Sequence, residues 1–158
     1  MTDSGLPAAY RLFVAPVRAK CRRLLGETSA AEDATQETFL RLLRSEPSLA
    51  ETAEPRVVLA WLYRTSTRIA IDMLRERRRR PIDAAVDAPS TCAVSAIEAR
   101  SVLARIGSDT PDDELAAAVL CRVDALTQPE AAHVLNVSER TVRRLLERFD
   151  ERMRKEHV

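Results

Sequence analysis

The chain has 158 residues, 46% of them hydrophobic and 31% charged, and its formal net charge is +1. This composition fits a soluble globular protein and argues against a disordered chain. Only three glycines and 4% aromatic residues are present, which favours helices with an aliphatic core over sheets with tight turns. We therefore predict an all-α fold.

Residues for catalysis or metal binding are scarce. The three cysteines are widely spaced without a C-x-x-C pair, and the two histidines, His133 and His157, have neither ligand nor triad spacing. No glycine-rich phosphate loop is found, so we expect neither an enzyme nor a cofactor. No apolar run approaches the roughly 20 residues of a membrane span. The start lacks a secretory apolar region, so we expect a cytoplasmic protein without membrane contact of its own.

The first quarter of the chain reads as two helices. Apolar residues at helical spacing over 10–25 predict one helix, which Pro16 should kink or divide in two. The pattern Ser29-x-x-Glu32 is typical of a capping box and predicts a second helix, running to about Arg44. The side chains of this helix expected to face inward are Phe39, Leu40 and Leu43.

A loop and a long helix should follow. Residues 45–56 contain two prolines and no periodicity, which is typical of a loop. A helix is predicted from about Val57 to Arg79, with Pro81 stopping it. Its inward stripe should comprise Val58, Leu62, Ile69 and Met73. Residues 81–94 have turn residues and no period, so they read as a flexible linker.

The second half reads as a separate helical domain. A second capping-box pattern, Ser95-x-x-Glu98, predicts a short helix to about Ile106. Thr110, Pro111 and Asp113 should begin the next, ending near Arg122. We thus predict two small helical domains, 1–80 and 95–158, joined by the linker 81–94.

The segment TQPEAAHVLNVSERTVRRLLERF has the organisation of a helix-turn-helix. Thr127-x-x-Glu130 caps a short helix, and Asn136 should take the left-handed turn conformation. The Val137 side chain is expected to plug the junction between the two helices by filling the space where they meet, and Ser138 is expected to cap the second helix. The inner face of that helix should carry Val142, Leu145, Leu146 and Phe149; the outer face should carry Glu139, Arg140, Arg143, Arg144 and Arg148.

Charge is unevenly distributed along the chain. Between residues 64 and 80, seven arginines face only Asp72 and Glu76, a local charge of +5, whereas residues 81–99 contain no lysine or arginine. The arginine run 77–80 is expected to contact phosphate without sequence preference, with a basic helix end favoured by the helix dipole as the alternative.

Three segments resemble the ECF (extracytoplasmic function) group of the sigma-70 family of bacterial RNA polymerase sigma factors. AEDATQETFLRLLR resembles the region that docks on the polymerase, and WLYRTSTRIAIDMLRERRRR resembles the helix that melts and reads the promoter −10 element. The helix-turn-helix segment resembles the part that reads the −35 element. The resemblance implies a region 2-like domain and a region 4-like domain. It also implies bacterial core RNA polymerase, promoter DNA and commonly an anti-sigma factor as partners.

The resemblance assigns roles to individual residues. Asp33, Gln36 and Glu37 are spaced to share one helix face, and the resemblance makes this face the polymerase-binding surface. The −10 element would be contacted by Trp61, Arg64, Thr65, Arg68 and Arg75, although for Trp61 the role of a core anchor is favoured. The −35 element would be contacted by Ser138, Glu139, Arg140, Thr141, Arg143, Arg144 and Arg148. Each of these faces also fits an ordinary solvated helix surface.

Two other functions fit parts of the pattern. A transcriptional regulator could use the same helix-turn-helix without binding polymerase, but residues 1–80 lack the alternating strands and helices of a receiver domain. A degenerate sigma-like protein could sequester a partner without starting transcription. The acidic segment 45–56, which lacks the aromatic residue usual in the family, is the support for this reading.

Overall fold

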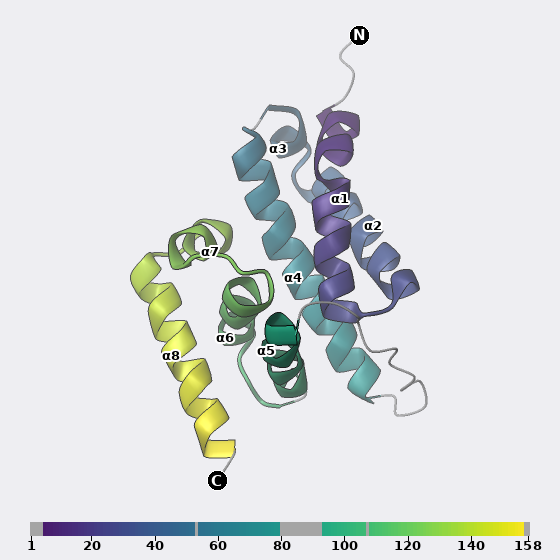
Figure 1. Ribbon diagram of the computed structural model, residues 1–158. Coiled ribbons are helices and arrows are strands. Elements are labelled where there is room, and N and C mark those ends of the chain that lie inside the picture. The colour runs from purple at the N-terminus through teal and green to yellow at the C-terminus, as the bar shows by residue number, and fades with distance from the viewer. Residues whose placement is uncertain (1–4, 53, 80–92, 107, 157–158) are drawn as a thin grey trace. The chain divides into compact units, whose positions relative to one another are not determined.

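The computed structural model describes residues 5–52, 54–79, 93–106 and 108–156 (Figure 1). Every regular element in these ranges is helical and no strand occurs in them, which confirms the all-α prediction. The elements are α1 (Gly5–Leu25), α2 (Thr28–Ser45), α3 (Pro47–Thr52), α4 (Pro55–Arg79), α5 (Ala93–Arg105), α6 (Asp112–Ala118), the π-helical turn η2 (Val119–Val123), α7 (Gln128–Leu135) and α8 (Glu139–Glu156).

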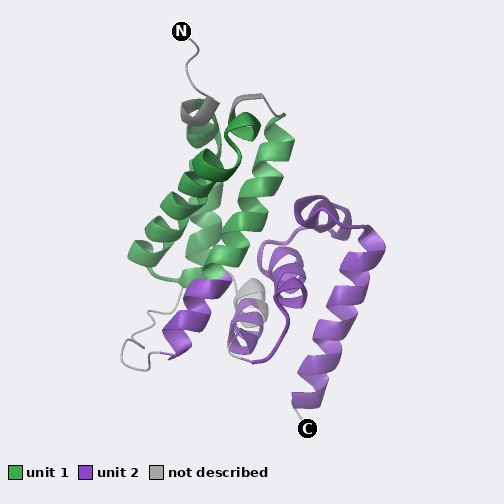
Figure 2. Cartoon of the chain, turned by 180° about the vertical axis from the view of Figure 1, so that it is seen from behind, with its two compact units in different colours: residues 1–70 green, residues 71–158 purple. Residues whose placement is uncertain are grey.

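The chain divides into two units, residues 1–70 and 71–158 (Figure 2). The division falls inside α4, so the last turns of this helix belong to the second unit. The domain bounds expected from the sequence, 1–80 and 95–158, remain a prediction. Most of the expected linker, with Pro81, lies outside the described residues, and α5 already begins at Ala93.

The core of the first unit lies between α1, α2 and the first part of α4. From α1, Val17, Cys21 and Leu24 are buried, as their helical spacing predicts. The ring of Tyr10 meets the Phe39 ring edge-on, with 4.9 Å between the ring centroids. From α4, Val58, Leu62 and Ile69 are buried as predicted, whereas Met73, in the second unit, is half-buried.

The inward face of α2 differs from the prediction. Leu40 and Leu43 are 41% and 42% exposed, so their inward assignment is wrong, and Leu42 is fully buried instead. The buried stripe is Ala31, Ala34, Thr35, Thr38, Phe39 and Leu42. Its two threonines escape the cost of burying a hydroxyl because each donates a 2.7 Å hydrogen bond to the carbonyl four residues earlier.

Several helix boundaries also differ from the predictions. Helix α2 begins at Thr28 after Glu27, so the Ser29 capping box does not form; the Glu32 carboxylate instead pairs with Arg18 Nε at 2.6 Å. Helix α1 continues through Pro16 without dividing. Residues 47–52 form α3 rather than loop.

The remaining differences concern the first residues of α3, α4 and α5. Pro47 and Pro55 each stand at the first position of a helix, where the missing N–H costs nothing. Helix α5 begins at Ala93, so Ser95 lies inside it and is no N-cap.

Lys20 is buried in the first unit with no exposed surface. Its ammonium nitrogen lies 5.2 Å from the centroid of the Tyr63 ring, on α4. A cation over an aromatic face is stabilised by the negative charge of that face, an effect that strengthens when water is excluded. This contact therefore joins α1 to α4 by more than apolar packing.

The core of the second unit is supplied mostly by α6, η2 and α8. Leu115, Leu120 and Phe149 are almost completely buried. The predicted helix from residue 110 to 122 exists, but it begins at Asp112 and widens into the π-helical turn over its last residues. No helix in the described parts of the chain is long and apolar enough to cross a membrane.

The contrast between two neighbouring leucines gives a stability test. We expect Leu42→Ala to lower the free energy of unfolding by about 2–5 kcal/mol, because it removes a fully buried side chain and leaves a cavity. The matched control Leu43→Ala should change it by no more than about 0.5 kcal/mol, because that side chain is exposed. Urea unfolding followed by the fluorescence of Trp61, the single tryptophan, reports on this unit. Equal losses in the two variants would contradict the assignment.

Candidate functional site

Helix α7 starts at a complete capping box. The Thr127 hydroxyl accepts a 3.3 Å hydrogen bond from the Glu130 N–H, and the Glu130 carboxylate accepts a 2.7 Å bond from the Thr127 N–H. The backbone bond, and then a bond from the Thr127 hydroxyl, lower the pKa of Glu130 below its ordinary value. The predicted box is thus confirmed, and it fixes where the first helix of the helix-turn-helix begins.

The turn between α7 and α8 also follows the prediction in its backbone. Asn136 has φ 56° and ψ 45°, the left-handed conformation that asparagine tolerates better than most residues. The Val137 N–H donates to the Ala132 carbonyl at 3.0 Å, and the Ser138 hydroxyl accepts from the Thr141 N–H at 3.1 Å. Ser138 is therefore the N-cap of α8.

Val137 does not plug the junction. Its side chain is 39% exposed, so the prediction is wrong. The left-handed turn at Asn136 directs the Val137 N–H back to Ala132, and the side chain remains at the surface. The interior at this point is filled by small residues of α7, with Ala131 and Ala132 both buried. His133 is exposed.

Helix α8 has one apolar face and one basic face. Val142 and Phe149 are buried, and Leu145 and Leu146 are half-buried, as predicted for the inner face. The residues that the helix exposes on its outer face are Glu139, Arg140, Arg143, Arg144 and Arg148, with Ser138 exposed and Thr141 half-buried at its start. The positions suit a helix that enters a DNA major groove by its N-terminal turns.

Polar contacts hold α8 against the rest of the unit. Arg152 Nε donates to the buried Glu114 carboxylate at 2.7 Å. The Arg122 guanidinium lies over the Phe149 ring, 5.3 Å from its centroid, and pairs with Asp150. Sequence reasoning missed these contacts because their partners lie 27 or more residues apart, where periodicity gives no signal.

The polar face of α2 is presented opposite its core stripe. Asp33 and Gln36 are exposed, whereas Glu37 is half-buried and pairs with Arg41 at 3.0 Å. The exposed Leu40 lies on this same face, three to four residues beyond Gln36 and Glu37, and Leu43 lies at its edge. The surface thus combines carboxylates, an amide and aliphatic side chains. Leu40 and Leu43 could have been predicted as part of this surface, because they lie four and seven residues after Gln36, a spacing that places them on the same side of a helix.

The middle of α4 gathers aromatic and basic side chains. Trp61, Arg64 and Thr65 are half-buried, and Arg68 is exposed. Burial lowers the pKa of Arg64 from its ordinary value; the nearby Arg68 charge lowers it further, and Glu46 opposes the shift. Two guanidinium groups held close together repel each other, so this surface favours an approaching negative charge.

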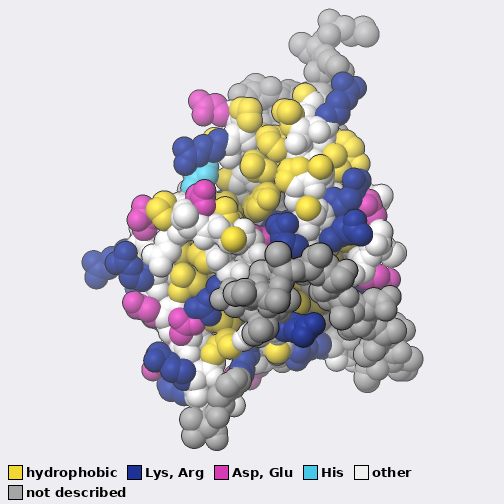
Figure 3. Space-filling model, in the orientation of Figure 1, with side chains coloured by type: hydrophobic (Ala, Val, Ile, Leu, Met, Phe, Trp, Pro, Cys, Tyr) yellow, Lys and Arg dark blue, Asp and Glu magenta, His cyan; other side chains and the backbone are white. Residues whose placement is uncertain are grey.

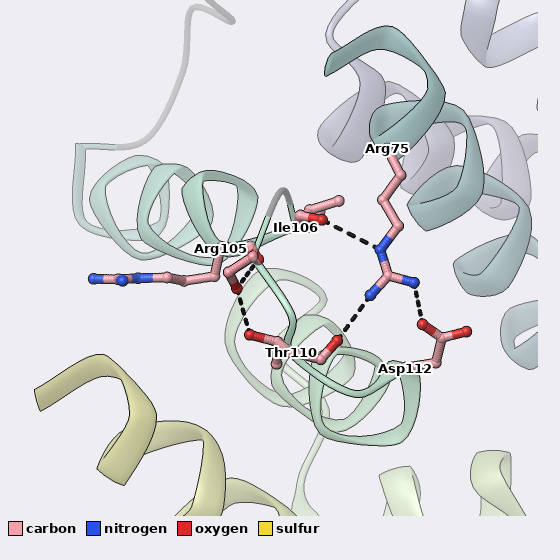
Figure 4. Close-up of polar contacts among 6 residues, drawn as sticks. Arg75, Arg105, Ile106, Thr110 and Asp112 are labelled. Atoms are coloured by element: carbon pink, nitrogen blue, oxygen red, sulfur yellow. Dashed lines mark hydrogen bonds and ion pairs between the residues drawn. The ribbon is translucent and has the colours of Figure 1, made fainter. Parts of the chain in front are cut away.

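Arg75 is placed differently from the other predicted −10 residues. It is only 22% exposed and points into the corner between α5 and α6, within the second unit (Figure 4). Its Nε donates to the Ile106 carbonyl at 3.2 Å and its Nη2 to the Thr110 carbonyl at 2.8 Å. Its Nη1 pairs with the Asp112 carboxylate. Arg75 therefore already binds three acceptors within the chain.

Taken together, these features describe an all-helical protein with a capped helix-turn-helix whose second helix, α8, exposes a basic face. Basic and acidic side chains alternate over the surface that Figure 3 shows, in keeping with the net charge of +1. Among the described residues, no group of three or more histidine, cysteine or acidic side chains is arranged to hold a metal ion.

Comparison with known proteins identifies the family. Residues 9–80 match the family model for sigma-70 region 2. ECF RNA polymerase sigma factor SigE of Mycolicibacterium smegmatis is 30% identical over 141 residues, which are 84% of this chain and 53% of the relative. SigW of Bacillus subtilis is 29% identical over 154 residues, 86% of this chain and 80% of the relative. The chain belongs to the sigma-70 family, in its ECF group.

The extent of the matches varies among relatives. SigG of Mycobacterium tuberculosis is 36% identical over 72 residues, which are 46% of this chain and 19% of the relative. The chain thus spans about half the length of SigE and a smaller part of SigG. The region 2 match extends past residue 70, where the two units divide, and includes Arg75.

The capping box predicts a pH-dependent contribution to stability. Because the folded pKa of Glu130 is lowered, its contribution is complete above the ordinary glutamate pKa and is lost as the pH falls through the folded value. We expect Glu130→Gln to lower the melting temperature at neutral pH, and this difference to shrink on acidification. Thermal unfolding by circular dichroism across acidic and neutral pH measures it. The exposed Glu147, on α8, provides the control Glu147→Gln. A difference that is constant with pH would contradict the cap.

Proposed function

We propose that this protein is an RNA polymerase sigma factor that binds core polymerase, brings it to a promoter and promotes separation of the DNA strands. The observation that carries the proposal is the exposed face of α2, with Asp33, Gln36 and Glu37, inside the segment that matches sigma-70 region 2. A regulator that carried only a helix-turn-helix would not need this face. The work requires no cofactor and takes place in the cytoplasm, where the polymerase is.

The α2 face supplies the chemistry for docking on a basic and polar protein surface. The carboxylates of Asp33 and Glu37 accept charge-assisted hydrogen bonds from arginines, and the Gln36 amide orients the contact. Leu40 and Leu43 add aliphatic area that loses water on binding. Interfaces of this kind derive most of their affinity from a desolvated centre surrounded by polar contacts.

The middle of α4 supports contact with a separated DNA strand. Unstacked bases pack on aromatic faces, and the backbone phosphates attract guanidinium groups, which suits Trp61, Arg64 and Arg68. Thr65 offers a hydroxyl beside them. Arg75 belongs to the same proposed set, although within the free chain it binds other acceptors.

The exposed face of α8 supports reading of a −35 element. Arginine can bind guanine through two parallel hydrogen bonds in the major groove, each such pair discriminating by about 1–3 kcal/mol. Arg140, Arg143 and Arg144 lie in the first turns, where base edges are reached, and Arg148 lies further along, where a phosphate is nearer. Ser138, Glu139 and Thr141 complete the contact surface at the helix start. An anti-sigma protein that restrains the factor remains a prediction.

Polymerase binding is the first test. We expect the wild-type protein to co-purify stoichiometrically with bacterial core RNA polymerase. The Asp33→Arg/Gln36→Ala variant should no longer co-purify, because a reversed charge repels the polymerase arginines. Asp113→Arg, a charge reversal at an exposed residue of α6, is the control and should bind normally. Failure of the well-folded wild type to bind would leave a helix-turn-helix regulator without polymerase docking as the better explanation.

Promoter binding tests the recognition face. Once run-off transcription with holoenzyme has identified a promoter, we expect Arg143→Ala or Arg144→Ala to weaken promoter binding by about 1–3 kcal/mol and to relax base preference in the −35 element. The control Arg154→Ala removes an exposed arginine from the last turn of the same helix. Its effect should be small and independent of the −35 sequence. Equal effects in all three variants would indicate general electrostatic attraction alone.

A further inference from the structure

The contacts of Arg75 define a local structure that the proposed function does not require. Four residues of the second unit take part: Arg75 from the end of α4, Ile106 and Thr110 from the segment between α5 and α6, and Asp112 from the start of α6 (Figure 4). We call these four residues the Arg75 latch. All three guanidinium nitrogens are engaged, and the acceptors lie 31 to 37 residues away in sequence.

The corner that holds Arg75 is itself organised by hydrogen bonds. The Ser108 hydroxyl lies 2.6 Å from the Arg105 carbonyl and 2.6 Å from the Thr110 hydroxyl. These bonds fold the segment between α5 and α6 so that the Ile106 and Thr110 carbonyls face the same guanidinium. A second arginine of α4, Arg78, donates to the Leu103 carbonyl at 3.4 Å. The last turns of α4 are thus attached to this corner at two places.

A cleft of about 620 Å³ lies beside the latch. Its basic lining residues are Arg75, Arg78 and Arg79, and its acidic lining residues are Asp109 and Asp112. Carboxylates therefore face the basic end of α4 across this cleft.

The acceptors in the latch resemble those of a nucleic-acid backbone. A carboxylate and two carbonyls offer a guanidinium the charge-assisted and neutral oxygen acceptors that phosphate and sugar oxygens also offer. The guanidinium has five N–H donors in one fixed plane, and three of them are directed at the latch acceptors. A DNA strand that takes these three donors has to displace the latch acceptors, so the closed latch competes with binding of DNA by Arg75.

We propose that the Arg75 latch is an autoinhibitory contact, in which the corner between α5 and α6 competes with single-stranded DNA for Arg75. The inference rests on the proposed function in one respect, namely that Arg75 is a DNA ligand. In the free protein the latch keeps this arginine from nucleic acid. Binding of a DNA strand along α4 displaces Asp112 and the two carbonyls and releases the end of the helix from the corner.

Asp112 is the residue through which the latch can be tested. Its side chain is 61% exposed, so replacement leaves the core intact, and it lies outside the proposed DNA-binding set. Asp113 gives a matched control: it is also exposed and also in the first turn of α6. In the described part of the chain, no hydrogen bond or ion pair joins Asp113 to Arg75. Asp113→Asn therefore makes the same change in charge and helix-end electrostatics without opening the latch.

The experiment measures binding of a fluorescent single-stranded oligodeoxynucleotide of mixed sequence to the full chain by anisotropy. We expect Asp112→Asn to bind about two- to five-fold more tightly than Asp113→Asn, the range expected for loss of a partly exposed ion pair. Arg75→Gln should bind more weakly than wild type. In the Arg75→Gln background the two asparagine variants should bind equally, which isolates the coupling between Arg75 and Asp112.

A second measurement observes the latch directly. By nuclear magnetic resonance, the Arg75 Nε–H should exchange slowly with water in the wild type, because it donates to the Ile106 carbonyl. Exchange should accelerate in Asp112→Asn and on addition of the oligonucleotide to the wild type.

Two results would overturn the inference. Equal affinities of Asp112→Asn and Asp113→Asn would show that the latch does not oppose DNA binding. An unchanged affinity in Arg75→Gln would show that Arg75 is not a DNA ligand. Neither result affects co-purification with polymerase, which tests the proposed function separately.

Discussion

The burial of one face of α2 is the constraint on which the candidate polymerase surface depends. Ala31, Thr35 and Leu42 are fully or almost fully buried, and a helix that buries one stripe necessarily turns the opposite stripe to solvent. Asp33 and Gln36 lie on that opposite stripe. The same rule orients α8, whose buried residues direct its arginines outward. In both helices the core decides which side chains are available to a partner.

Local chemistry in the sequence predicts some features well because nearby atoms are sufficient to form them. The Thr127 box, the left-handed Asn136 and the Ser138 cap all exist, and each involves residues within four positions of one another. The Ser29 pattern is of the same kind but fails, because α2 already begins at Thr28 and Ser29 lies inside the helix; the Glu32 carboxylate pairs with Arg18 on α1.

Features that depend on contacts distant in sequence could not be predicted. The leucine pattern of α2 suggested that Leu40 and Leu43 face inward, but threonine hydroxyls that bond their own helix allow polar residues to occupy the buried stripe. The burial of Lys20 depends on the Tyr63 ring, and the position of Arg75 depends on carbonyl groups beyond residue 105. Backbone carbonyls carry no sequence signature, so no motif marks where a guanidinium will find them.

The charge balance of the chain constrains how it can act on DNA. Non-specific affinity grows with the number of phosphates neutralised, and a net charge of +1 with interspersed acids supplies little of it. In the proposed Arg75 latch, one more arginine is engaged within the chain and is not available to a phosphate. Under the proposed function, a chain built in this way would gain its DNA affinity mainly after joining the polymerase, where the polymerase positions the promoter and several weak contacts act together. On the same proposal, weak binding by the free chain would limit occupation of promoters without polymerase, and the acids around Arg75 would serve the function in this way.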